Sequence, residues 1–302
     1  MDEATIQPQA SQTPEALPAA LTDLVQRDLE RWLVEDGTPA PLAQAMQYCC
    51  LGGGKRLRPA LVHLSAGALG QDPPSQITRR AAVAVELIHC YSLVHDDLPG
   101  MDNDTLRRGK PTAHVRFGEA MAILAGDALL TRAFSVLAES GDPRSAALVA
   151  ELARAAGPAG IIAGQVADMK LCPVSEGIEG VQYIHLRKTA ALLEAPARMG
   201  AICADADAPT IDALGRFARL LGLAYQVMDD ILDATASAEQ LGKTPGKDLQ
   251  ADKLSAVACL GPDGARRLCQ DLTQQSLGAL DTLGQRAAPL RRLARHLVNR
   301  TY

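Results

Sequence analysis

The sequence is poor in the residues that build β-sheets. Aromatic residues make up only 3% of its 302 residues, and runs of β-branched residues are few, whereas Ala and Leu are plentiful. Aromatic and β-branched side chains favour strands, while Ala and Leu favour helices. No alternating apolar and polar pattern is long enough to indicate a strand. We therefore predict an all-α protein.

The cysteine and leader patterns of secreted or zinc-binding proteins are also missing. The seven cysteines form no C-x-x-C pair, which argues against a zinc site and a disulfide framework. No basic region followed by an apolar stretch opens the chain, so we expect no secretory signal. No window of about 18 residues is both uncharged and apolar enough to span a bilayer. These absences predict a soluble, cytoplasmic protein that is not embedded in a membrane.

The chain has neither a basic charge balance nor an internal linker. Its net charge of -5 argues against a general nucleic-acid-binding surface. Residues 1–18 are rich in Gln, Pro, Thr and Ala and are predicted to form a mobile tail. Residues 19–302 show no change of composition and are predicted to form one large helical bundle. Helical periodicity and Pro or Gly breaks predict helices at 76–97, 118–139, 142–156, 158–171, 176–203, 207–235 and 250–260.

The chain does carry two dense groups of carboxylates among apolar neighbours. The first acidic segment, residues 96–102, contains Asp96, Asp97 and Asp102, and the second acidic segment, residues 229–233, contains Asp229, Asp230 and Asp233. Neighbouring carboxylates that are taken out of water resist ionisation unless a cation accompanies them. Magnesium uses a few carboxylates together with substrate phosphates. The two segments therefore predict a site for a metal-bridged phosphate compound.

The spacing of the second acidic segment puts its carboxylates on one face of a helix. Gln226, Asp229, Asp230 and Asp233 follow the spacing i, i+3, i+4, i+7, so they form one stripe. The other faces are apolar, and the stripe must face a cavity or solvent. The alternative is the solvated face of an amphipathic helix, but such a face would more often mix Lys and Glu with Asp.

The first acidic segment is predicted to end a helix. Pro99-Gly100 stops regular structure, and carboxylates at a helix C-terminus oppose the helix dipole, which again indicates a cation. His89 and Asp96 are seven residues apart and share a face. His95-Asp96 could instead indicate the His/Asp metal site of phosphohydrolases. That site needs further histidines, and the six in this chain are scattered.

Basic residues follow or precede the acidic segments in short clusters. Residues 52–58, Gly-Gly-Gly-Lys-Arg-Leu-Arg, offer backbone N–H groups and cations to a phosphate, although a Walker loop spacing is absent. Further cations stand at 107–110, at Lys188 and at Lys243. Carboxylates for magnesium and separate cations for bare phosphate would allow two diphosphates to bind at once.

At this point the chain resembles the trans-isoprenyl diphosphate synthases, and most of all bacterial farnesyl diphosphate synthases (geranyltranstransferases). The resemblance is carried by collinear segments: GGGKRLRPAL at 52–61, ELIHCYSLVHDDLPGMDNDTLRRGKPTAH at 86–114, GEAMAILAGDALLTRAF at 118–134, GQVADM at 164–169, LRKTAAL at 186–192 and GLAYQVMDDILD at 222–233. It implies an all-α bundle around a deep central cavity, the isoprenoid synthase fold, and a homodimer.

The resemblance also implies roles for individual residues. Mg²⁺, as three ions with diphosphate bound, would be held by the six aspartates Asp96, Asp97, Asp102, Asp229, Asp230 and Asp233. Direct charge on the allylic diphosphate would come from Arg107, Lys188 and Lys243. Isopentenyl diphosphate would be bound without metal by Lys55, Arg58, His89 and Arg108. Thr189 and Gln226 would place oxygen dipoles near a developing carbocation.

The implied reaction is ionisation, condensation and elimination, which joins isopentenyl diphosphate to dimethylallyl or geranyl diphosphate to give farnesyl diphosphate. The positions that line the cavity floor in the family correspond to Tyr91 and Ser92, and a bulky Tyr91 would favour the farnesyl length. The alternatives are a geranylgeranyl or longer-chain synthase and a non-catalytic regulatory subunit. A terpene cyclase would carry a different second metal motif, which this chain lacks. Asn103 and Thr105 interrupt what is often a longer Asp run in the family.

Overall fold

The computed structural model describes residues 17–235 and 254–299, and their regular secondary structure is almost entirely helical. The elements are α1 (Ala19–Trp32), α2 (Ala40–Leu51), α3 (Leu57–Ala68), α4 (Gln76–Asp96), β1 (Leu106–Arg107), β2 (Lys110–Pro111), α5 (Ala113–Phe117), α6 (Glu119–Ala138), α7 (Ser145–Ala156), α8 (Ile161–Asp168), α9 (Ile178–Ile184), the π-helix η1 (His185–Ala190), α10 (Ala191–Cys203), α11 (Ala208–Thr235), α13 (Ala256–Gly278), the 3₁₀-helix η2 (Asp281–Ala287) and α14 (Ala288–Val298). The all-α prediction is confirmed. Most of the predicted tail lies outside the described residues.

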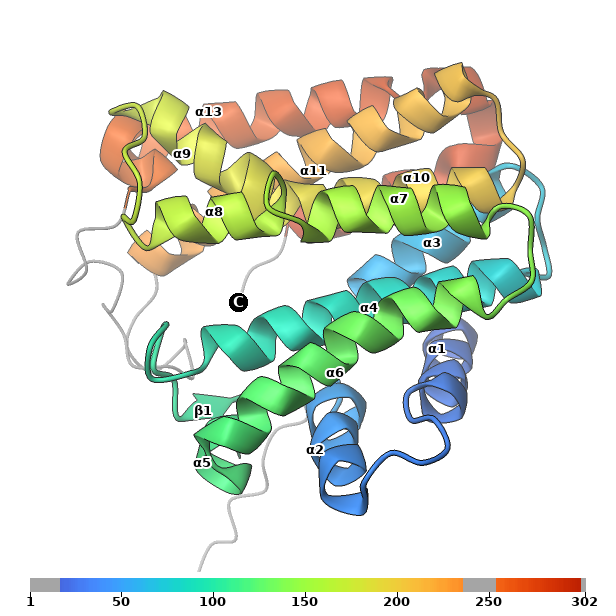
Figure 1. The fold of residues 1–302 in the computed structure, drawn as a ribbon. Helices are drawn as coiled ribbons and strands as arrows, with labels where there is room; N and C mark the ends of the chain where they lie inside the picture. The colour runs from blue at the N-terminus through green and yellow to red at the C-terminus, as the bar shows by residue number, and fades with distance from the viewer. Residues whose placement is uncertain (1–16, 236–253, 300–302) are drawn as a thin grey trace, which may run out of the picture.

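Helix α4 lies at the centre of the bundle, with α6 in front of it and α3, α10 and α7 above it (Figure 1). Ser75 caps its N-terminus, because the Ser75 hydroxyl accepts a hydrogen bond from the Thr78 N–H at 3.4 Å. Most of its side chains from Ile77 to Val94 are buried, as expected of a helix surrounded by other helices. Pro99-Gly100 follows its last turn and ends it. The first acidic segment is thus attached to the most enclosed helix of the fold.

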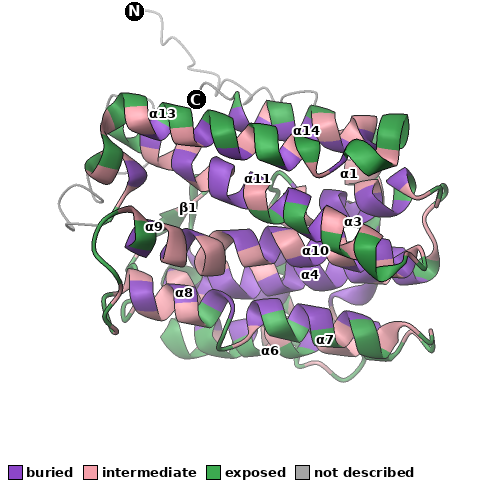
Figure 2. Cartoon of the chain, turned by 90° about the horizontal axis from the view of Figure 1, so that it is seen from above, coloured by how far each residue is buried: buried purple, intermediate pink, exposed green. Residues whose placement is uncertain are grey.

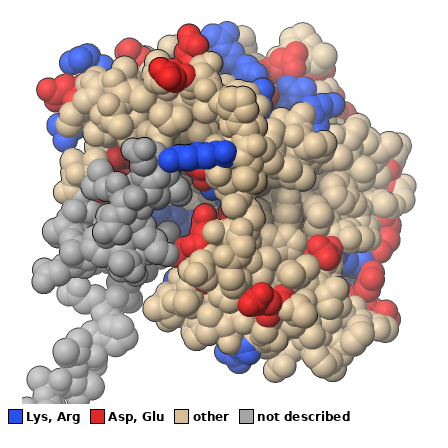
Figure 3. All heavy atoms as spheres, turned by 60° about the vertical axis from the view of Figure 1, so that its left-hand side comes forward, with Lys and Arg blue, Asp and Glu red and all other residues tan. Residues whose placement is uncertain are grey.

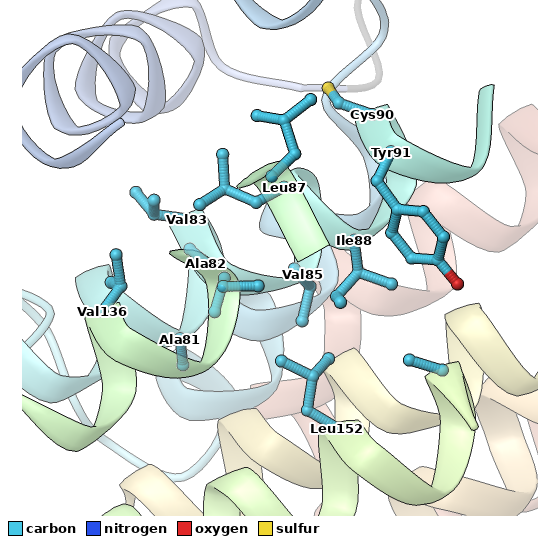
Figure 4. Close-up of a cluster of buried hydrophobic side chains, with 14 of the residues drawn as sticks. Ala81, Ala82, Val83, Val85, Leu87, Ile88, Cys90, Tyr91, Val136 and Leu152 are labelled. Carbon is cyan, nitrogen blue, oxygen red and sulfur yellow. The ribbon is translucent and has the colours of Figure 1, made fainter. Parts of the chain in front are cut away.

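Apolar side chains fill two adjoining cores. The first core lies between α1, α4, α6 and α7, and Figure 4 shows its centre along α4, with Val136 of α6 and Leu152 of α7 against it. The second core lies between α3, α10, α11, α13 and α14. Helix α10 belongs to both, because Leu192 faces the first core and Leu193 faces the second. The buried stripes seen from above in Figure 2 run along these shared helices.

The long predicted helix 176–203 is continuous but contains a π-helical segment at 185–190. Two glycines allow neighbouring helices to approach this segment closely. A Cβ atom added to Gly164 of α8 would lie 2.3 Å from the Lys188 backbone N, and one added to Gly222 of α11 would lie 2.7 Å from the Ala190 Cα. Helices α8 and α11 therefore enclose the π-segment at distances that only glycine permits.

The sequence did not indicate the small antiparallel hairpin of β1 and β2. Its two-residue turn consists of Arg108 (φ 53°) and Gly109 (φ 73°), which is the positive-φ pair that a tight hairpin requires. The strands contain only two residues each, so no alternation could reveal them. Another difference lies in the C-terminal region, where α13 continues past 260 to Gly278 through a kink at Gly261.

Two segments are long and apolar enough to cross a membrane when up to two charged residues are allowed, which is a less strict test than the uncharged window considered in the sequence. These segments are Glu119–Ala138 and Ser145–Asp168. Of the apolar 18-residue window in each, 44% and 39% respectively is buried in the bundle. Core helices of large bundles meet the same test. The second segment is interrupted in the structure, because α7 ends at Ala156 and α8 begins at Ile161.

The close packing of α11 against the π-segment makes a prediction about Gly222. Gly222→Ala should lower the free energy of unfolding by about 1–3 kcal/mol, because the added methyl group overlaps Ala190. Urea unfolding followed by circular dichroism measures this change. Gly67→Ala in α3 is the matched control, since no atom lies within 4 Å of its added Cβ. This substitution should raise the free energy of unfolding by about 0.5–1 kcal/mol. Equal effects of the two substitutions would contradict the packing argument.

Candidate active site

The C-terminal ends of α4 and α11 point to the same end of the bundle, where the hairpin also lies (Figure 1). Figure 3 shows a recess at this end in which acidic and basic side chains lie next to each other. The two acidic segments, more than a hundred residues apart in the sequence, are therefore brought to one region. This region is the candidate active site.

The first acidic segment forms a tight loop that folds back on the end of α4. The Asp102 N–H donates a hydrogen bond to the Asp96 carbonyl at 2.8 Å, and the Met101 N–H donates to the Leu98 carbonyl at 2.9 Å. The loop thereby returns Asp102 towards Asp96. Burial raises the pKa of Asp96 to about 6, with Lys188 opposing the rise and Asp102 adding to it. Asp96 is a carboxylate that ionises reluctantly until a cation is near.

Asp97, which directly follows the last residue of α4, is bound by Arg107 of the hairpin. The Arg107 Nε lies 2.9 Å from both carboxylate oxygens of Asp97, and its Nη2 lies 2.5 Å from Oδ1. Asp97 is only 3% exposed, so this ion pair neutralises a buried charge. The sequence assigned Asp97 to metal and Arg107 to diphosphate. In the structure these two charges are paired with each other.

Four residues were predicted to bind isopentenyl diphosphate without metal. Three of them, Arg58, His89 and Arg108, come close enough to influence one another electrostatically. Arg108 donates a hydrogen bond to the Gly53 carbonyl, which brings the hairpin onto the glycine loop. Burial, and then the charges of Arg58 and Arg108, hold the pKa of His89 well below its usual range. Lys55 is exposed on the same loop. The nearby Arg56 is different, because it is bound to Glu86 at 2.7 Å in the interior.

Arg58 provides the clearest sign of an anion site in this basic group. Its Nε is buried and has no hydrogen-bond partner among the described residues. Burial lowers the pKa of its guanidinium. A buried donor without a partner costs about 1–3 kcal/mol, and more when it is charged. An oxygen-rich anion such as a phosphate would remove that cost.

The π-segment carries the predicted Lys188 and Thr189 between the two acidic segments. Lys188 Nζ lies 2.5 Å from Asp168 Oδ2, and its charge also acts on Asp96. The Thr189 hydroxyl donates to the Gln226 side-chain oxygen at 2.8 Å, so these two predicted dipoles are adjacent. Short π-segments inside helices often occur at functional sites, because they turn side chains out of the regular register.

In the second acidic segment, Asp230 is already held by protein donors. Its Oδ2 accepts a hydrogen bond at 2.7 Å from the N–H of Ala256, the first residue of α13. The His185 Nε2 lies 3.6 Å from the same oxygen. Burial raises the pKa of Asp230 to about 6, and Asp229 and Asp233 add to the rise. The three carboxylates of this stripe thus repel one another within one turn of α11.

The residues fit a magnesium ion that is shared with phosphate better than one held by protein alone. No group of three or more His, Cys, Asp and Glu side chains converges on a common metal position within residues 17–235 and 254–299. Magnesium typically takes one or two carboxylates and completes its shell with phosphate and water. Burial raises the pKa of Asp96 and of Asp230, so a cation near either carboxylate would stabilise its ionised form. The predicted Mg²⁺ site remains a prediction.

The two predicted floor residues are both buried on α4. Tyr91 is 7% exposed, and its ring meets the His95 ring edge-on at 5.8 Å. Ser92 is 8% exposed and its hydroxyl donates to the His89 carbonyl at 2.9 Å. In Figure 4 the Tyr91 hydroxyl points away from the apolar cluster around Leu87. Lys243 lies outside the described residues.

Sequence reasoning missed three participants in the site. Asp168 was part of a matching segment but received no role, although it pairs with Lys188. His185 and the Ala256 N–H both face Asp230. The position of His185 three residues before Lys188 was a usable signal in a regular helix, where it would share a face with Lys188. A backbone N–H carries no sequence signal at all.

The crowding of carboxylates predicts that Asp96 destabilises the fold without metal. The pKa of Asp96 in the folded state, about 6, exceeds its ordinary value of 3.8, so its ionised form destabilises the fold above pH 6. With divalent cations chelated, Asp96→Asn should raise the free energy of unfolding at pH 7.5 by about 1–2 kcal/mol, discounted for partial exposure. The gain should shrink as the pH falls from 6 to 4. Urea unfolding at several pH values tests this.

The control is Asp23→Asn, which removes an exposed carboxylate of α1 and should change stability by less than about 0.5 kcal/mol. Destabilisation by Asp96→Asn at pH 7.5 would contradict the electrostatic reading of the site.

Comparison with known proteins agrees with this geometry. A family model described as polyprenyl synthetase matches residues 39–279. The large subunit 1 of the heterodimeric geranylgeranyl pyrophosphate synthase of Arabidopsis thaliana is 46% identical, over 87% of this chain and 73% of that protein. The geranylgeranyl pyrophosphate synthase of Catharanthus roseus is 44% identical, over 87% of this chain and 74% of that protein.

Solved structures show the same architecture. An FPP/GFPP synthase from Zymomonas mobilis superposes with a TM-score of 0.81 at 35% identity, over 92% of this chain and 98% of that chain. A geranyltransferase from Legionella pneumophila superposes with a TM-score of 0.81 at 32% identity, over 93% of this chain and 95% of that chain. The family match covers both acidic segments, the glycine loop, the hairpin and the π-segment. The chain therefore belongs to the polyprenyl synthetase family and is a prenyltransferase with the all-α isoprenoid synthase fold.

Proposed function

We propose that the protein is a magnesium-dependent prenyltransferase that condenses isopentenyl diphosphate with dimethylallyl or geranyl diphosphate to give farnesyl diphosphate. The observation that carries this proposal is the presence of two clusters of charged side chains, of opposite composition, at one end of the bundle. One is acidic, with Asp96 and Asp102 at the end of α4. The other is basic, with Arg58, His89 and Arg108. Two diphosphates, one bound through a metal ion and the other bound directly by basic side chains, would match these two clusters.

The acidic site would hold the allylic diphosphate, with the aspartates of both segments toward Mg²⁺. When bound, the metal supplies positive charge that stabilises diphosphate as a leaving group. Lys188 acts electrostatically on Asp96 and would add a positive charge to the same cluster. Arg58, with its unpaired Nε, and Arg108 would hold isopentenyl diphosphate so that its double bond faces the allylic carbon.

The remaining chemistry needs protection of a carbocation. Thr189 and Gln226 are hydrogen-bonded to each other, and their oxygens would face the developing positive charge. The apolar residues of α4 exclude water, which would otherwise trap the cation. After the new carbon–carbon bond forms, a proton is lost to the departing diphosphate, so no side chain has to serve as a general base.

A second candidate product is geranylgeranyl diphosphate. The observation in its favour is that the relatives described above at 44% and 46% identity are named geranylgeranyl pyrophosphate synthases. The observation in favour of farnesyl is the bulky, buried Tyr91 five residues before Asp96. A pocket closed by a tyrosine side chain has less room for a growing chain than one closed by a small residue.

The function is tested by incubating the protein with isopentenyl diphosphate and either dimethylallyl or geranyl diphosphate, with and without Mg²⁺, and by sizing the products. We expect elongation only with the metal. Asp96→Ala should lower kcat by about 10²–10³-fold, whereas Asp23→Asn, at an exposed position of α1, should leave it unchanged. Absence of metal-dependent elongation by the protein alone would overturn the proposal and favour a non-catalytic subunit.

The product length gives a separate prediction. Tyr91→Ala should shift the products from farnesyl towards geranylgeranyl or longer diphosphates, because loss of the buried ring would free space for a longer chain. Chromatography of the dephosphorylated products measures the distribution. Tyr183→Ala is the control, because Tyr183 lies on α9, where Arg187 covers its ring at 3.7 Å. An unchanged distribution in Tyr91→Ala would show that another residue closes the pocket.

A further inference from the structure

His185, the first residue of the π-segment, is buried beside the second acidic segment. Its exposed fraction is 6%, and its Nε2 lies 3.6 Å from Oδ2 of Asp230, whose side chain is 11% exposed. Asp168 also acts on it electrostatically. The imidazole is therefore in contact with a carboxylate of α11 and under the electrostatic influence of one from α8.

The geometry decides which ring nitrogen carries the hydrogen. Nε2 faces a carboxylate oxygen, and a lone pair in that position would be repelled, so the hydrogen belongs on Nε2. Nδ1 is then an acceptor. It is buried and has no hydrogen-bond partner among the described residues. A buried acceptor without a partner is costly, and in a site that binds hydrated ions its natural partner is a water molecule.

The distance of 3.6 Å between His185 Nε2 and Asp230 Oδ2 is longer than a hydrogen bond. Contacts of this kind in ligand-free sites often shorten when the site fills. Asp230 Oδ2 is held from the other direction by the Ala256 N–H at 2.7 Å. Two donors on one oxygen would leave Oδ1 turned in a fixed direction. The Gln226 side chain also forms a hydrogen bond with Asp230, so the imidazole would be a third contact that limits rotation of the carboxylate about its χ2 angle.

We propose that His185 is a positioning residue: its Nε2–H fixes the orientation of the Asp230 carboxylate in the second acidic segment, so that the segment binds Mg²⁺ together with diphosphate. This inference rests on the proposed function and adds to it a residue that touches neither substrate nor product. Partners that orient metal ligands typically change metal affinity or activity by about 10–100-fold when they are removed.

The test compares two substitutions that differ in where they place an amide. His185→Gln puts its amide N–H near the position of Nε2, whereas His185→Asn reaches only the position of Nδ1. Calorimetric titration of inorganic diphosphate into each protein, at a series of MgCl₂ concentrations, gives the Mg²⁺ concentration at which the metal-dependent part of diphosphate binding is half-maximal. We expect this concentration to rise by about 10–100-fold in His185→Asn and by less than about threefold in His185→Gln. In the condensation assay, the Mg²⁺ dependence should shift in the same order.

His63→Asn is the matched control. His63 is also 6% exposed, and neither of its ring nitrogens has a hydrogen-bond partner among the described residues, but it lies in α3 near Asp28 and Arg79. It should leave the Mg²⁺ dependence unchanged even where it lowers the unfolding temperature. Equal Mg²⁺ dependence of His185→Asn and His185→Gln, or an equal shift in His63→Asn, would overturn the inference. Absence of any Mg²⁺-dependent part of diphosphate binding to the unsubstituted protein would instead contradict the proposed function, and the inference with it, because the basic group around Arg58 accounts only for binding without metal.

Discussion

The structure depends on keeping several carboxylates ionised at a place where burial opposes their charge. Burial raises the pKa of both Asp96 and Asp230 to about 6, so each acidic segment costs stability in the absence of a cation. The fold limits this cost by giving some of the acids a protein partner. Asp97 is paired with Arg107, and Asp168 with Lys188. The acids that remain short of positive charge are the ones that a metal ion would stabilise.

The π-segment connects these electrostatic contacts to the packing of the bundle. It places His185 against Asp230, Lys188 against Asp168, and Thr189 against Gln226. Its wider backbone requires that the neighbouring helices approach without side chains, which Gly164 and Gly222 permit. A short irregularity in one helix thus supplies contacts to α8 and α11 at once. Such an irregularity persists only because the helices around it hold it in place.

Much of this could be predicted from the sequence, because the governing interactions are local. Helical periodicity predicted most of the helices, and the i, i+3, i+4, i+7 spacing predicted the stripe that carries Asp229, Asp230 and Asp233. The proline and glycine after Asp97 predicted the end of α4. The segments that matched a known family predicted the fold that the comparison with solved structures confirms.

The contacts that the sequence could not predict are those that depend on tertiary placement. The hairpin turn at Arg108 and Gly109 has no Asn-Gly or Asp-Gly signal, yet it decides that Arg107 meets Asp97. The π-segment has no sequence signature, since the same residues would also form an ordinary helix. The capping of α13 by Asp230 joins residues 26 positions apart through a backbone N–H. In each case the residue types were visible, but their partners were not.

The separation of an acidic cluster from a basic cluster has a chemical reason in the proposed reaction. Both substrates carry a diphosphate, so the group itself cannot tell the enzyme which bond to break. The diphosphate that must leave needs the strongest stabilisation of developing charge, which a divalent cation among carboxylates provides. The diphosphate that must stay needs only to be held, and arginine forks beside a neutral histidine can do this without activating it. Separate placement of Asp96 and of the group around Arg58 and His89 would therefore assign the roles of leaving group and anchor before any substrate reacts.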